Sequence, residues 1–143
     1  MPHIIRAGQI YTACHPLDEG RRIRISEYVA GSNRVDVVDA DTGARPRSIL
    51  VKELHLTAAT RQGRPRRTGY VLDTGGMWRV GYSASSTFPW EWHCTTTVTT
   101  GIQRHQCPKW GVARSEAGAQ QGVEDHVAAV HPAGTDAPEA EDR

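Results

Sequence analysis

Apolar and polar residues alternate along the first half of the chain, in the pattern of half-buried β-strands. Ile23 and Ile25 fall on one side of an extended segment, and Arg22 and Arg24 fall on the other. Similar segments, separated by turn-forming glycine, asparagine and aspartate, predict further short strands. We expect strands at residues 8–14, 22–29, 35–39, 48–51 and 68–72, with one helical turn at 52–56 and a polar loop at 57–67.

Five short strands with tight turns, and a helical turn before the last of them, predict a small β-barrel over residues 7–72. The pattern resembles the SH3-like barrels of the KOW and Tudor type, and this resemblance implies a five-stranded SH3-like barrel. A fragment of an OB-fold or an open sheet would produce a similar pattern, so these alternatives stay open.

A second unit is expected after a short linker at residues 73–76. Residues 77–82 predict a strand, and residues 90–110 predict a β-hairpin rich in threonine, valine and aromatic residues. We place the two-residue turn of this hairpin on Thr100-Gly101, which pairs residue 99 with residue 102.

A helix is expected after the hairpin. Ser115 is a favourable N-cap, and Pro132 cannot continue the helix beyond about Val130. The predicted fold class is therefore α+β and mainly β, with a ββα unit over residues 77–132 following the barrel. Residues 133–143 are rich in alanine, proline and acidic residues, which predicts a disordered acidic tail.

Two cysteines and two histidines in the last third of the chain have the side chains of a zinc site: Cys94, Cys107, His126 and His131. The expected hairpin register places Cys94 opposite Cys107, where Cβ atoms lie about 4.5–5.5 Å apart. The histidines have the spacing of zinc-finger histidines. We therefore predict a zinc-finger-like ββα unit in which these four residues hold a structural zinc ion.

The spacing of the four residues also departs from that of a usual finger. Twelve residues separate the cysteines, where a finger has two to four. On a straight helix His126 and His131 would diverge by about 140°, so the helix must loosen or end before His131 for both to reach one ion. Two alternatives stay open: burial of the same residues without a metal, and a Cys94–Cys107 disulfide, which a reducing cytoplasm disfavours.

Segments in both halves resemble uncharacterised proteins of actinobacteria. Residues 92–115, followed by His126 and His131, are similar to small zinc-finger-like proteins of these bacteria. Residues 21–25 and 66–70 are similar to barrel proteins of actinobacteria and their phages or integrative elements. The resemblance implies no established activity and no residue roles beyond the four metal ligands.

Basic residues are concentrated in the first half of the chain. Residues 1–72 carry a formal charge of +5 and residues 73–143 carry −4, and 15 of the 17 basic residues are arginine. Arginine is well suited to binding phosphate, and a loop at 61–67 contains four arginines. The residues predicted to contact nucleic acid are Arg22, Arg24, Arg61, Arg64, Arg66 and Arg67.

Several classes of function are disfavoured by the sequence. No stretch approaches the roughly 20 apolar residues of a membrane span, and the N-terminal segment lacks a secretory signal, so we expect a cytoplasmic protein. No phosphate-binding loop or nucleophile motif is present. The sequence predicts a non-enzymatic accessory protein that binds DNA or RNA or has a regulatory role. The alternative is a protein–protein adaptor of phage or mobile-element origin.

Overall fold

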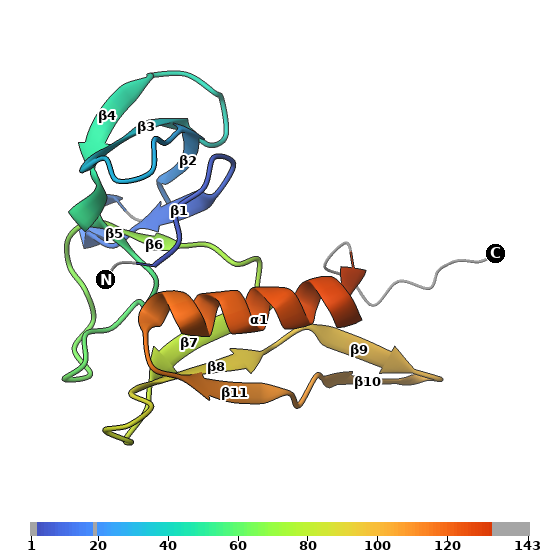
Figure 1. Ribbon diagram of the computed structural model, residues 1–143. Helices are drawn as coiled ribbons and strands as arrows, with labels where there is room; N and C mark the ends of the chain where they lie inside the picture. Colours follow the sequence, from blue (N-terminus) through green and yellow to red (C-terminus); the bar gives the residue numbers. More distant parts are fainter. Residues whose placement is uncertain (1–2, 19, 133–143) are drawn as a thin grey trace. The chain divides into compact units, whose positions relative to one another are not determined.

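The computed structural model describes residues 3–18 and 20–132, so the predicted acidic tail lies outside the described residues. These described residues form a mainly β fold with a single α-helix, which comes last in the element order (Figure 1). Contacts divide the chain after Asp73 into two compact units. Among the described residues, no helix has the length and apolar character that crossing a membrane requires.

The first unit is a curled six-stranded sheet with the strand order β4-β3-β2-β1-β6-β5 (Figure 1). All neighbouring strands are antiparallel except β5 and β6, which are parallel. The strands are β1 (Ile10–Ala13), β2 (Arg22–Glu27), β3 (Arg34–Asp39), β4 (Arg47–Leu50), β5 (Leu54–His55) and β6 (Tyr70–Leu72). Two short 3₁₀ turns are η1 (Pro16–Asp18) and η2 (Val51–Glu53).

Alternation of apolar residues accounts for the core of this sheet. Ile23 and Ile25 of β2 and Val35 and Val37 of β3 are almost completely buried, together with Tyr11 of β1. All five expected strands are present, and their ends differ from the predicted ends by at most two residues.

The expected helical turn at 52–56 is too long. The turn covers only Val51–Glu53, and the next two residues form β5, which pairs with Tyr70 and Val71 of β6. A strand of two residues leaves no recognisable alternation in a sequence, so only the tertiary pairing defines it.

His3 makes the stability of the first unit dependent on pH. His3 is buried, and its Nε2 lies 2.7 Å from the Tyr11 hydroxyl. Burial, and secondarily the nearby His55, lower the pKa of His3 to about 4, whereas an unfolded chain has a histidine pKa near 6.5. The unfolded state therefore binds more protons between these values, and we expect the first unit to lose roughly 2–3 kcal/mol as the pH falls from about 6.5 to 4.

Hydrogen exchange of residues 3–73 at several pH values measures this loss. A His3→Gln variant retains a hydrogen-bonding side chain without the titration, so its stability should vary less over the same pH range. His55, whose pKa is also lowered by burial and by Arg66, contributes in the same direction and remains in the variant. An unchanged pH dependence in His3→Gln would contradict the assignment.

The second unit has a three-stranded antiparallel sheet with the order β11-β8-β7 and a separate two-stranded hairpin. Helix α1 packs against all three strands of the sheet, and the hairpin of β9 and β10 extends beyond them (Figure 1). The elements are β7 (Trp78–Tyr82), β8 (Trp90–Cys94), β9 (Thr97–Thr100), β10 (Gln103–Gln106), β11 (Trp110–Ala113) and α1 (Glu116–Val130).

The predicted hairpin register is wrong by two residues. Thr100 pairs with Gln103, so the two-residue turn is Gly101-Ile102 and not Thr100-Gly101. The turns that suit such hairpins require a positive φ at their first central residue, and Gly101 has φ +63° there. The sequence interpretation had placed Thr100 at that position, where a side chain is strained.

Candidate metal centre

The corrected register still places the two cysteines on one face, with Cys94 at the end of β8 and Cys107 between β10 and β11. The Cys94 amide donates to the Lys109 carbonyl, and the Cys107 amide donates to the Thr96 carbonyl, each at 2.9 Å. The two cysteines are therefore diagonal neighbours across the two strands and do not face each other directly. Because the error is an even number of residues, it leaves each side chain on its predicted face.

The helix supplies the two histidines and ends where the site requires it to end. Ser115 caps the N-terminus by accepting a hydrogen bond of 2.9 Å from the Gly118 amide. The last helical residue is Val130, and His131 has the non-helical angles φ −126° and ψ 58°. This change of direction brings the His131 side chain to the same point as His126, which a continued helix would prevent.

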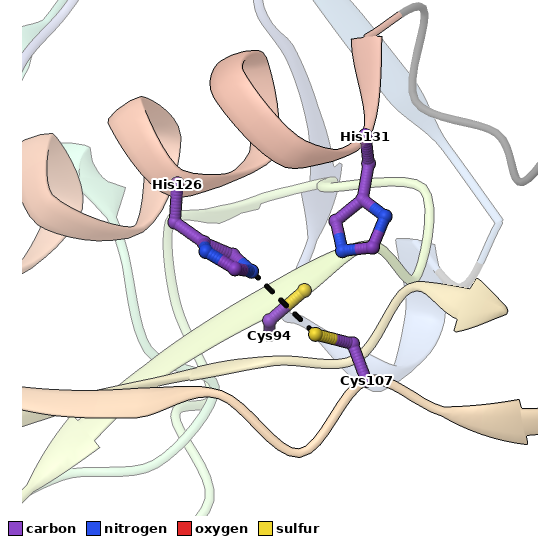
Figure 2. Close-up of side chains that lie close together, drawn as sticks. All are labelled: Cys94, Cys107, His126 and His131. Carbon is purple, nitrogen blue, oxygen red and sulfur yellow. Dashed lines mark hydrogen bonds between the residues drawn. The ribbon is translucent and has the colours of Figure 1, made fainter.

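Figure 2 shows the four side chains pointing toward one another. One ligand atom from each of Cys94, Cys107, His126 and His131 lies within 4.8 Å of the other three. The Cys107 Sγ and the His126 Nε2 are 3.5 Å apart. A tetrahedral zinc ion with ordinary bond lengths would separate such atoms by about 3.3–3.8 Å, so a small contraction suffices. These four residues could hold a metal ion.

His131 provides an independent test of whether a metal fits. The residue is only 6 % exposed, and its Nε2 is buried without a hydrogen-bond partner among the described residues. A buried polar atom left unpaired costs about 1–3 kcal/mol. A metal ion bound to this nitrogen would remove that cost, and the two thiols and the second imidazole are placed to complete its coordination.

Burial sets the protonation of the site. Burial raises the pKa of the Cys107 thiol and lowers the pKa of His126, and His131 and Lys109 lower the latter further. His126 is therefore a neutral imidazole near pH 7, which is the form that binds a metal. The Cys107 thiol must lose its proton when a metal binds.

Lys109 faces this site and was missed in the sequence interpretation. Its charge favours the thiolate of Cys107 and disfavours protonation of His126. The signal was available, because Lys109 lies only two residues after Cys107 in the sequence.

Other histidines and cysteines stay outside the centre. His93 contacts Glu91 at 2.9 Å and stacks on Trp110, and His105 is exposed. Cys14 belongs to the first unit, and all three cysteines are free thiols.

The six arginines predicted to contact nucleic acid fall into two groups. The first group is held by the first unit itself. Arg22 lies 3.5 Å from Asp41 and 3.3 Å from Asp73, and Arg24 donates to the Ala40 carbonyl at 3.2 Å. Arg66 donates to the Thr57 carbonyl at 2.7 Å, and this hydrogen bond joins the two ends of the loop at residues 57–67. The second group is exposed on the same loop and consists of Arg61, Arg64 and Arg67.

Comparison with protein-family models, with curated proteins and with solved structures found no match for this chain.

Proposed function

We propose that the chain is a non-enzymatic nucleic-acid-binding accessory protein whose C-terminal unit is held together by a structural zinc ion. The observation that carries this proposal is the convergence of Cys94, Cys107, His126 and His131, with the His131 Nε2 buried and otherwise unpaired. Two thiolates and two imidazoles in a tetrahedral arrangement favour zinc. Four protein ligands leave no open position for water, which is typical of structural sites.

The composition of the second unit supports a need for metal. Residues 74–132 contain no leucine, and their single isoleucine, Ile102, is fully exposed. Helix α1 also contains Gly118 and Gly122, each of which disfavours a helix by up to about 1 kcal/mol relative to alanine. Small units with so little aliphatic core commonly depend on a metal or a disulfide. We regard the unit as a ββα zinc-finger-like fold enlarged by β7 and by a longer hairpin.

The charge of the first unit supports binding to phosphate. Its residues carry most of the basic side chains of the chain, and Arg61, Arg64 and Arg67 are exposed on one loop. The strand order and the 3₁₀ turn after β4 are consistent with an SH3-like barrel. In this proposal Arg22, Arg24 and Arg66 stabilise the unit, and the three loop arginines contact the backbone of DNA or RNA.

Salt dependence of binding tests the nucleic-acid proposal. Fluorescence anisotropy with labelled single-stranded and duplex oligonucleotides should show affinity that falls steeply as salt rises, because bound counterions are released. The double variant Arg64→Ser/Arg67→Ser should reduce the slope of log K against log salt by about 1.5.

The matched control is Arg6→Ser/Lys52→Ser, which removes the same charge from exposed positions outside the loop. It should reduce the slope of log K against log salt less than Arg64→Ser/Arg67→Ser does. Absence of measurable affinity for either oligonucleotide at low salt would refute the nucleic-acid proposal.

A further inference from the structure

The three-stranded sheet of the second unit has an outer face that the metal centre does not use. Trp92 and Cys94 of β8 point toward α1, so alternation along the strand turns His93 to the opposite face. The register aligns His93 with Trp110 of β11 on one side and with Arg79 of β7 on the other. These three side chains form one row across the outer face.

Two exposed apolar side chains lie on the outer face of β11, and a third precedes β8. Trp110 is 57 % exposed, Val112 on the same face is 44 % exposed, and Phe88, just before β8, is 37 % exposed. Single exposed apolar residues are common, whereas a tryptophan with more than half its surface in water is unusual. Trp110 and Val112 share the outer face of the edge strand β11, and Phe88 contacts Arg114 just beyond the end of that strand, so the apolar residues follow one edge of the sheet and indicate a binding surface.

Both aromatic rings are held in place by a neighbouring side chain. The Trp110 indole stacks on the His93 ring, with a centroid separation of 6.2 Å and planes inclined by only 18°. The Arg114 guanidinium lies 5.5 Å from the centre of the Phe88 ring. The rings are therefore oriented before any ligand binds, which lowers the entropy lost on binding. His93 lies next to Cys94 in β8, and Trp110 begins β11 shortly after Cys107. A metal bound at the two cysteines would therefore also stabilise the strands that form this surface.

The charges around these rings are mainly positive. Arg79 and Arg114 are exposed, and Glu91, two residues before His93 on the same face of β8, contacts His93 at 2.9 Å. The remaining acidic residues of the described second unit lie in α1, which covers the opposite face of the sheet. Exposed aromatic rings accompanied by cations match the bases and phosphates of a single strand of nucleic acid.

We propose that this outer face binds single-stranded nucleic acid, with bases stacked on Trp110 and Phe88 and phosphates paired with Arg79 and Arg114. The inference rests on the proposed nucleic-acid function, but it assigns a surface on the second unit and a preference for unpaired bases. A duplex buries its base faces in its own stack, so only a single strand can place a base on the Trp110 indole.

Trp110→Ala in the full chain tests this surface, with labelled oligo(dT), oligo(U) and a mixed-sequence duplex of equal length as probes. The wild type should bind the single strands more tightly than the duplex. Trp110→Ala should weaken single-strand binding about tenfold or more, the size expected for one base–aromatic stack, and Trp110→Phe should restore most of it. The ratio of oligo(dT) to oligo(U) affinity identifies whether DNA or RNA is preferred.

Control variants keep the test decisive. Leu17→Ala removes an apolar side chain that is 89 % exposed in the first unit and should leave affinity unchanged. Arg79→Ser should lower the slope of log K against log salt by about 1, because it removes one phosphate contact. This variant leaves Trp110 in place, so it tests the outer face even if Trp110→Ala does not fold.

The contradictory outcomes separate the two proposals. If Trp110→Ala and Arg79→Ser bind single strands like the wild type while Arg64→Ser/Arg67→Ser loses affinity, the outer-face assignment is wrong and the proposed function stands. If the wild type binds no nucleic acid, both are wrong. A concentration-dependent dimer that Trp110→Ala abolishes, with unchanged affinity for oligonucleotides, would show that the face contacts a second copy of the chain instead.

Discussion

Replacing Cys107 with serine is expected to unfold the second unit. The serine hydroxyl is a poor zinc ligand near neutral pH, so the variant would lose one of the four bonds to the proposed ion. Apparent binding energies of structural zinc are about 10–16 kcal/mol in zinc-finger peptides, which equals or exceeds the whole stability of a typical domain. A unit with no buried leucine or isoleucine has little else to offset that loss.

Tryptophan fluorescence reports this unfolding selectively, because all four tryptophans of the chain lie in residues 78–110. Cys107→Ser, or the wild type treated with a strong chelator, should show red-shifted emission and a lost thermal transition. The matched control is Cys14→Ser, which removes a thiol of the first unit and should leave the emission unchanged. His131→Gln and His105→Gln form a second pair, in which only the first should unfold. Native-like emission from Cys107→Ser would contradict a stabilising metal.

Replacing Gly111 with alanine is expected to destabilise the second unit by about 1–3 kcal/mol, the usual cost of overpacking a core. A Cβ at Gly111 would lie 2.6 Å from ring atoms of Trp92, and a Cβ at Gly122 would lie 2.9 Å from its Nε1. The indole therefore occupies a slot between a strand glycine and a helix glycine. The Trp92 ring also packs beside His126 with 5.8 Å between centroids, so moving it would disturb a proposed metal ligand.

Gly81→Ala is the matched control for this prediction. Gly81 lies in β7 of the same sheet, its φ is not positive, and a Cβ there would meet no atom within 4 Å. At an unstrained position glycine-to-alanine usually stabilises by about 0.4–1 kcal/mol through the unfolded state. Chemical denaturation followed by tryptophan emission should therefore give opposite signs for the two variants. Equal and small effects would show that Trp92 does not occupy the slot.

Short-range patterns made most of the strands predictable. Alternation marked β2 and β3 because one face of each is buried, and Ser115 and Pro132 marked the helix because capping and termination are local effects. The condition that the helix must loosen or end before His131 also followed from helical geometry, and in the structure the helix ends at Val130.

Features that depend on distant residues could not be predicted in this way. The pairing of β5 is defined only by β6. The hairpin register is a different case, because the preference of glycine for the first turn position is local, and this position was assigned to Thr100 in error. Arg22 was predicted to be a surface cation because alternation places it on the polar face of its strand, yet Asp41 and Asp73 pair with it from other parts of the chain. The two glycines that admit Trp92 carry no local signal either, since helix propensity disfavours Gly122.

Metal stoichiometry tests the central claim most directly. Native mass spectrometry and elemental analysis of the full chain, purified without chelator, should find one zinc ion per chain in the wild type and in Cys14→Ser. Neither method should find zinc in Cys107→Ser. A wild-type protein that is folded and contains no metal would contradict the account.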